Sequence, residues 1–239
     1  MALPRRKKLK TNKMTKEKSD RKIVIPGEVV AKGPDFLPGE GTEKIEDEIV
    51  AIKYGLLEES NGLMKVIALS GTYQPRRGNV VIGKVENVTF YGWVINLDSA
   101  DGAFLPLQEV PTYVEKEDMT EVLDIGEMVA AKIVGVSGRG VDLTIKLRGL
   151  GRIDEGMIVK VNPNKVPRVI GKEGSMISLI KEESGCEVTV GQNGLVWIQG
   201  KTIEEELLVK RAIEFISEKS FSHGLTEEVK EWFKKQKKE

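Results

Sequence analysis

The stretch VIGKEGSMI, residues 169–177, decides how the C-terminal part of the chain is interpreted. Two glycines, Gly171 and Gly174, stand three positions apart, with Lys172 between them and apolar residues on both sides. Glycine lacks a Cβ, so another backbone can approach it closely. A helix that starts after the second glycine would point free N–H groups and a partial positive charge into the same gap. The combination suits a sugar-phosphate backbone, although a G-x-x-G alone also fits a tight helix–helix turn.

The residues around this loop predict a single order of elements. Apolar residues recur at helical spacing after Gly174, and Gly185 stands where a C-terminal helix glycine belongs. Thr202 and Glu205 form a capping box, which opens a further helix. The predicted order is a strand over 158–161, a short helix over 163–170, the glycine loop, a helix over 175–184, strands over 186–190 and 195–199, and a last helix from 203.

Upstream of this region, the spacing of apolar residues changes from helical to alternating. Residues 141–147 place Val, Leu, Ile and Leu on one face and Asp, Thr and Lys on the other. Glycines at 92 and 102 mark corners between shorter strands. Five strands are predicted, over 80–88, 93–97, 103–105, 127–136 and 141–147. Five short strands with glycine at the corners indicate a small Greek-key barrel of the OB type.

The segment from residue 23 to about 70 predicts a small all-β module. The dipeptides Pro26-Gly27 and Pro38-Gly39 are turn signals, and apolar strands are expected over 49–54 and 63–69. The intervening Glu59-Ser60-Asn61-Gly62 is typical of a hairpin turn. Residues 23–69 carry four Lys and nine Asp or Glu. An acidic β module of this kind, without chemistry of its own, is expected to dock on a partner or a neighbouring domain.

Charge is distributed unevenly along the 239 residues, although the net charge is zero. Residues 1–22 hold ten Lys or Arg and two Asp or Glu, which indicates a basic disordered arm. The arm either binds phosphate or protein, or is only solvated. The remaining residues hold 27 basic and 35 acidic side chains, so a nucleic-acid site on them must be a local basic patch. Between Val159 and Lys172 there are four basic residues and no acidic one.

Composition also limits the location and the chemistry. No apolar run approaches the roughly 20 residues of a membrane span, and the N-terminus lacks the apolar stretch of a secretion signal. The single cysteine, Cys186, fits a reducing compartment, so the cytoplasm is expected. His223 is the only histidine, and Cys186 begins an apolar strand as a small core residue. We therefore expect no catalytic residue, no metal site, no cofactor and no enzymatic activity.

The order of elements around the glycine loop resembles a KH domain. In that family the loop clamps about four nucleotides of a single strand. The resemblance implies that Gly171, Lys172 and Gly174 form the clamp and that Lys165 and Arg168 flank it. Glu173 departs from this pattern, because a carboxylate beside a phosphate path weakens binding. The loop is therefore either an RNA site or a structural turn.

The five-stranded segment resembles the S-one (S1) RNA-binding domain, a family of OB-folds. The stretches 83–85, 91–97 and 101–107 match its strand and turn pattern. Its members commonly stack bases on aromatic side chains of the sheet. Val94 and Leu105 depart from the usual aromatic and histidine positions. The resemblance implies an RNA-binding set of Lys84, Phe90, Tyr91, Trp93, Arg139 and Lys146, of which the aromatic residues alternatively belong to the core.

The domain order as a whole resembles the archaeal exosome RNA-binding cap subunit, the ribosomal-RNA-processing protein four family. The implied fold is multidomain: an arm over 1–22, an all-β module over 23–70, an OB-fold β-barrel over 71–150, an α+β KH domain over 151–222 and a charged tail over 223–239. The resemblance implies a non-catalytic trimeric cap that binds single-stranded RNA. The cap would guide RNA into the pore of a hexameric, phosphorolytic 3′-to-5′ exoribonuclease ring of RNase PH-like subunits, for RNA degradation and processing. The alternative is a free-standing transcription elongation or translation factor.

Overall fold

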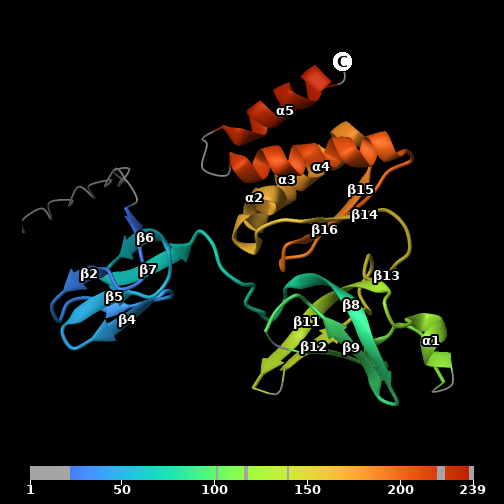
Figure 1. The fold of residues 1–239 in the computed structure, drawn as a ribbon, viewed down its shortest axis with the longest axis horizontal. Helices are drawn as coiled ribbons and strands as arrows, with labels where there is room; N and C mark the ends of the chain where they lie inside the picture. Colours follow the sequence, from blue (N-terminus) through green and yellow to red (C-terminus); the bar gives the residue numbers. More distant parts are fainter. Residues whose placement is uncertain (1–21, 101, 116–117, 139, 220–223, 237–239) are drawn as a thin grey trace, which may run out of the picture. The chain divides into compact units, whose positions relative to one another are not determined.

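The computed structural model describes residues 22–100, 102–115, 118–138, 140–219 and 224–236 (Figure 1). The predictions for Arg139, for His223 and for the arm up to residue 21 lie outside these residues. The chain divides into two compact units, residues 1–68 and residues 69–239. Each unit has its own core and is treated separately below.

Two small sheets form the first unit. Asn61 and Gly62 both have positive φ, 51° and 79°, which matches the tight turn of a two-residue hairpin. The hairpin predicted from this dipeptide is confirmed, but its first strand is β6 (Gly55–Ser60), which the sequence analysis did not predict. One sheet has the order β1 (Ile23–Val24), β6, β7 (Leu63–Ala68), β3 (Leu37–Pro38), and the other β2 (Val29–Lys32), β5 (Glu48–Ala51), β4 (Thr42–Ile45).

A closed five-stranded barrel begins the second unit, and its strands confirm all five predicted segments. They are β8 (Val80–Thr89), β9 (Gly92–Asn96), β10 (Ala103–Pro106), β11 (Met128–Ser137) and β12 (Gly140–Thr144). Hydrogen bonding follows the order β12-β10-β9-β8-β11, and the β11–β12 pairing closes the barrel. The short η1 (Leu107–Glu109) and α1 (Met119–Val122) lie between β10 and β11. Val141, Leu143 and Ile145 face the core as predicted, whereas Leu147 follows the end of β12 and is exposed.

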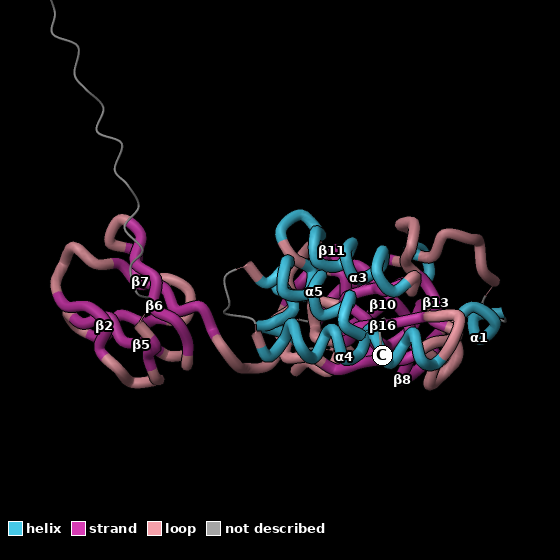
Figure 2. The backbone as a smooth tube through the Cα atoms, turned by 90° about the horizontal axis from the view of Figure 1, so that it is seen from above, coloured by secondary structure: helices cyan, strands magenta, loops and turns pink. Residues whose placement is uncertain are grey.

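The α+β domain follows β13 (Gly151–Ile153), which adds to the edge of β11. Its sheet has the antiparallel order β14-β16-β15, and helices α2, α3 and α4 cover one face of it (Figures 1 and 2). Its elements are β14 (Met157–Lys160), η3 (Pro163–Lys165), α2 (Val166–Ile170), η4 (Lys172–Gly174), α3 (Ser175–Ser184), β15 (Glu187–Val190), β16 (Leu195–Gln199) and α4 (Ile203–Glu218). This order confirms the prediction, and the Thr202 side chain accepts the predicted capping bond from the Glu205 N–H.

The last helix, α5 (Leu225–Gln236), corrects the prediction of a charged tail over 223–239. Leu225, Val229 and Phe233 are buried in the same core as α3 and α4. The Trp232 ring stacks on Phe215 of α4 with centroids 5.8 Å apart. The charged residues of α5 are exposed or half-buried, so an amphipathic helix completes the domain. Among the helices that the structure describes, none is long and apolar enough to cross a membrane.

The barrel and the α+β domain are joined by the turn between β15 and β16. The Asn193 side chain is 4% exposed and makes three hydrogen bonds to barrel backbone. Its Oδ1 accepts from the Ile82 N–H at 3.2 Å, and its Nδ2 donates to the carbonyls of Ile82 and Leu97 at 2.7 and 3.0 Å. Gln192 exchanges two further bonds with Val80, of 2.8 and 3.1 Å. Four of these five bonds attach the turn to the beginning of β8, and the fifth attaches it to Leu97 after β9.

Candidate nucleic-acid interface

The glycine loop has a backbone shape that requires glycine at its first position. Gly171 has φ 76° and ψ 174°, and a Cβ there would lie 2.6 Å from the Met176 nitrogen. Gly174 adopts the left-handed conformation, with φ 82°. The loop therefore turns the chain sharply between α2 and the ten-residue helix α3, whose N-terminus has no side-chain cap. Close approach of a second backbone is possible at Gly174, where only the Ile177 side chain would lie within 4 Å of an added Cβ, at 3.7 Å.

Three of the cations that the sequence analysis assigned to this loop and its flanks are exposed or half-buried. Val166 and Val169 of α2 are buried, so Arg168 lies on the exposed side of that helix. Lys172 is exposed and Lys165 is half-buried, and within the described part of the chain no ion pair is formed by either or by Arg168. Lys160 differs, because its ammonium pairs with Asp98 of the barrel. Three cations of the predicted patch thus remain available to phosphates.

Glu173 adopts a left-handed backbone conformation, with φ 54°, and its carboxylate is exposed beside Lys172. Non-glycine residues adopt this conformation uncommonly, and it is strained by roughly 1 kcal/mol. The carboxylate places a negative charge at the loop, as expected from the sequence. This carboxylate opposes a phosphate at the loop, so the groups there that could hold one are backbone N–H groups and the flanking cations.

Two adjacent aromatic residues of the barrel are exposed to solvent. Phe90 and Tyr91, in the turn from β8 to β9, are 74% and 73% exposed. Thr89 fixes the turn, because its Oγ1 donates to the Gly92 carbonyl at 2.8 Å and accepts from the Tyr91 N–H. Adjacent large aromatic rings in water are unfavourable unless they serve a contact, and single-strand binding proteins use such rings to stack bases. The pair therefore stays a candidate for base stacking.

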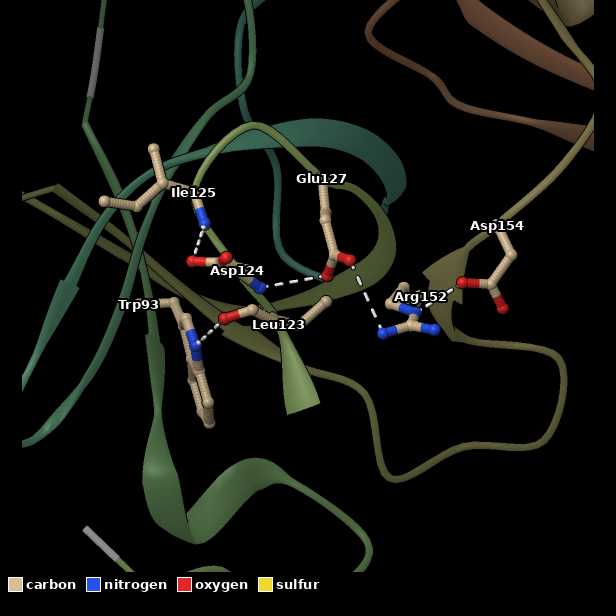
Figure 3. Close-up of polar contacts among 7 residues, drawn as sticks. All are labelled: Trp93, Leu123, Asp124, Ile125, Glu127, Arg152 and Asp154. Carbon is tan, nitrogen blue, oxygen red and sulfur yellow. Dashed lines mark hydrogen bonds and ion pairs between the residues drawn. The ribbon is translucent and has the colours of Figure 1, made fainter. Parts of the chain in front are cut away.

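Trp93 is a correction to the predicted RNA-binding set, because its side chain is fully buried. Its Nε1–H donates to the Leu123 carbonyl at 2.8 Å, which fixes the segment after α1 (Figure 3). The Asp124 N–H then donates to Glu127, and Arg152 of β13 pairs with Glu127 at 3.4 Å. The difference from Tyr91 is one of position, because Tyr91 lies in the turn before β9 whereas Trp93 lies within β9 and points into the closed barrel. Trp93 is a structural residue.

The remaining predicted barrel residues do not gather at one place. Lys84 is exposed on β8, opposite Asn96 and Met128. Lys146 follows β12 and lines a groove of about 390 Å³ together with Arg77 and Lys132. The sequence analysis predicted Lys146 but missed Arg77 and Lys132. The available signals were the Arg76-Arg77 pair before Gly78 and a single lysine within the apolar run of β11.

The one cysteine, which could in principle act as a nucleophile, is packed in a hydrophobic core. Cys186 is 3% exposed in the core of the α+β domain, as predicted, and burial raises the pKa of its thiol. Within the part of the chain that the structure describes, no cluster of three or more His, Cys, Asp or Glu could hold a metal ion.

Comparison with known proteins gives two domain matches that agree with this geometry. Residues 74–146 match the family described as S1 RNA binding domain, and residues 156–204 match a KH domain. An Exosome complex component Rrp4 from Methanothermus fervidus is 39% identical over 214 residues, which cover 89% of this chain and 95% of that protein. Another from Nitrosopumilus maritimus is 37% identical over 90% of this chain and 96% of its own length.

The chain belongs to the Rrp4 family of exosome components. A further Rrp4 relative, from Methanobrevibacter smithii, is 40% identical over 88% of this chain and 70% of its own length. A crystal structure described as an exosome complex RNA-binding protein superposes with a TM-score of 0.61 at 32% identity, covering 70% of this chain and 98% of that one. Membership in the Rrp4 family confirms the predicted fold class and resemblance, with S1 preceding KH along the chain.

Proposed function

We propose that the chain is the non-catalytic RNA-binding cap subunit of an archaeal exosome in the cytoplasm. It captures single-stranded RNA on its S1 and KH domains and guides the strand into the pore of a hexameric ring of phosphorolytic RNase PH-like subunits. The cap contains three copies of the chain. The observation that carries this proposal is the Rrp4 relationship over about nine-tenths of the chain, together with an S1 domain followed by a KH domain.

The first unit supports docking on a protein partner. Within its described residues, nine large hydrophobic side chains are exposed and only five hydrophobic residues are buried. They include Leu37 at 59% and Ile45 at 54% exposure, both on strands. Exposed apolar surface of this extent on a small module indicates a protein contact. We assign this unit to the contact with the ring, and the KH loop and the S1 surface to RNA.

The experiment is affinity purification of the tagged chain from its native cells, followed by mass spectrometry. We expect RNase PH-like subunits to co-purify. Leu37→Asp with Ile45→Asp should abolish co-purification, while the purified variant still binds a single-stranded oligonucleotide. The control is Ile203→Asp on α4, which places one such charge at a site of 68% exposure and should retain the ring.

Two results would contradict the proposal. Recovery of the chain with ribosomes or RNA polymerase, and without nuclease subunits, would favour the free-standing elongation or translation factor. Degradation of RNA by the purified chain alone, abolished by a carboxylate substitution, would show a catalytic protein.

A further inference from the structure

The barrel carries a cationic groove that neither the glycine loop nor the exposed aromatic pair includes. Its lining combines three cations, Arg77, Lys132 and Lys146, with one carboxylate, Glu109, and with the apolar Val134 and Leu147. Its volume is about 390 Å³. Among the residues that the structure describes, no ion pair joins any of the three cations to an acidic side chain. Residues 22–239 carry an excess of acidic charge, so this cluster is a local exception on the surface.

Strand register explains why these side chains share one face. Lys132 lies opposite Thr144 in the β11–β12 pairing, and both line the groove. Val134 lies at the register shift between Ile133 and Gly135, and it lines the same groove as Lys132. Val134 and Leu147 are 37% and 48% exposed, so the groove has a charged and an apolar side. This pairing of surfaces suits a nucleotide, whose phosphate is anionic and whose base has an apolar ring face.

Glu109 further limits the classes of ligand that fit the groove. Its backbone carbonyl accepts from the Ile145 N–H at 3.0 Å, which holds the residue beside the end of β12. A carboxylate repels a free phosphate but accepts hydrogen bonds from hydroxyl and amino groups. A ligand with both a phosphate and such donors therefore matches the groove better than an inorganic anion. An RNA strand has both, with its 2′-hydroxyls and base amino groups.

The groove adjoins the joint between the two domains. Lys132 is the ladder partner of Val80, and Val80 exchanges two hydrogen bonds with Gln192 of the KH turn. The groove therefore lies at the end of the barrel on which the KH domain is seated. Phe90 lies at the other end of the ten-residue β8, about 30 Å away at 3.3 Å per residue. The groove is thus a separate site from the aromatic turn.

We propose that this groove binds the phosphodiester backbone of single-stranded RNA through Arg77, Lys132 and Lys146, with Val134 and Leu147 against a ribose or base. The inference rests on the RNA-binding function proposed above and adds a contact that connects the S1 barrel with the KH domain. A strand held by the KH loop then continues onto the barrel at its KH-facing end.

The first test measures binding of a single-stranded RNA to the full chain at several salt concentrations. Each phosphate contact on a single strand contributes about 0.7 to the slope of log K against log salt. Arg77→Gln with Lys132→Gln should therefore lower the slope by about 1.4 and the affinity at 0.1 M salt by about 25-fold. The matched control, Lys201→Gln with Arg211→Gln, removes the same charge from exposed positions at α4 and should leave the slope unchanged.

The second test uses the unaltered chain, so it does not depend on the folding of a variant. RNA that contains 4-thiouridine is photo-crosslinked to the chain, and the crosslinked peptides are identified. We expect crosslinks within residues 77–82, 132–136 or 144–148. Crosslinks at the KH loop or at Phe90 but not in these segments, with an unchanged salt slope in the double variant, would overturn the groove and leave the proposed function standing. A wild-type chain that binds no RNA would overturn both.

Discussion

Asn193→Ala is the substitution that tests most directly whether the S1 and KH domains form one body. The Asn193 side chain is 4% exposed and makes all three of its hydrogen bonds to the barrel. Its removal leaves the Ile82 N–H and the carbonyls of Ile82 and Leu97 without these partners. A hydrogen bond contributes about 1 kcal/mol net, and an unsatisfied buried group costs about 1–3 kcal/mol. We therefore expect the joint to lose about 3–5 kcal/mol, reduced where water replaces the amide.

Calorimetry of the full chain measures this loss. For a unit of this size, 1 kcal/mol corresponds to about 2–4 °C in Tm, so the transition that includes the S1 and KH domains should fall by about 10 °C or divide in two. Hydrogen exchange provides a local readout, because the Ile82 amide donates to Asn193 Oδ1 and should lose its protection. Asn193→Asp should be at least as destabilising, since it replaces both donated bonds with a buried carboxylate oxygen facing two carbonyls.

The control is Asn87→Ala, which removes an exposed asparagine from the same strand, β8. It should shift Tm by less than about 2 °C, consistent with an ordinary surface substitution. If Asn193→Ala had the same Tm as this control and kept the Ile82 amide protected, the Asn193 hydrogen bonds would not hold the two domains together.

Two further predictions concern the α+β core and the start of the barrel. Phe233→Ala should lower the free energy of unfolding by about 3–5 kcal/mol, because the ring is fully buried and its centroid lies 5.1 Å from that of Trp232. Urea unfolding measures this loss, and the exposed control Glu231→Ala should change the free energy of unfolding by close to zero. Burial raises the pKa of Tyr73 to about 12, so its contribution to stability is complete below the unfolded pKa of about 10 and is lost as pH rises to about 12. Urea midpoints at pH 9 and pH 11 should therefore fall more for the wild type than for Tyr73→Phe, and equal falls would contradict the shift.

Several features of the fold were predictable because they depend on neighbours in the sequence. The Asn61-Gly62 turn, the Thr202 cap and the glycine at the end of α3 are set by backbone conformations within a few residues. Helix α5 had a signal of the same kind, since Leu225, Val229 and Phe233 repeat every four residues. The charge of that segment outweighed this spacing in the prediction.

The candidate site was predictable only in part. Gly171 and Gly174 identify the loop from the sequence, and the structure adds that a side chain at Gly171 would meet Met176. Phe90, Tyr91 and Trp93 lie within four residues, yet two are exposed and one is buried. Tyr91 lies in the turn before β9 and Trp93 within that strand, and which face of β9 is interior depends on how the barrel closes.

By itself, the sequence determined the type and order of the domains, because periodicity, turn residues and caps act over a few positions and appear directly in the chain. Only the tertiary structure decided which side chains meet. Lys132 and Lys146 share a groove because β11 pairs with β12, and Asn193 reaches Ile82 across 111 positions of sequence. Such contacts depend on strand register and domain packing, which a local pattern does not encode.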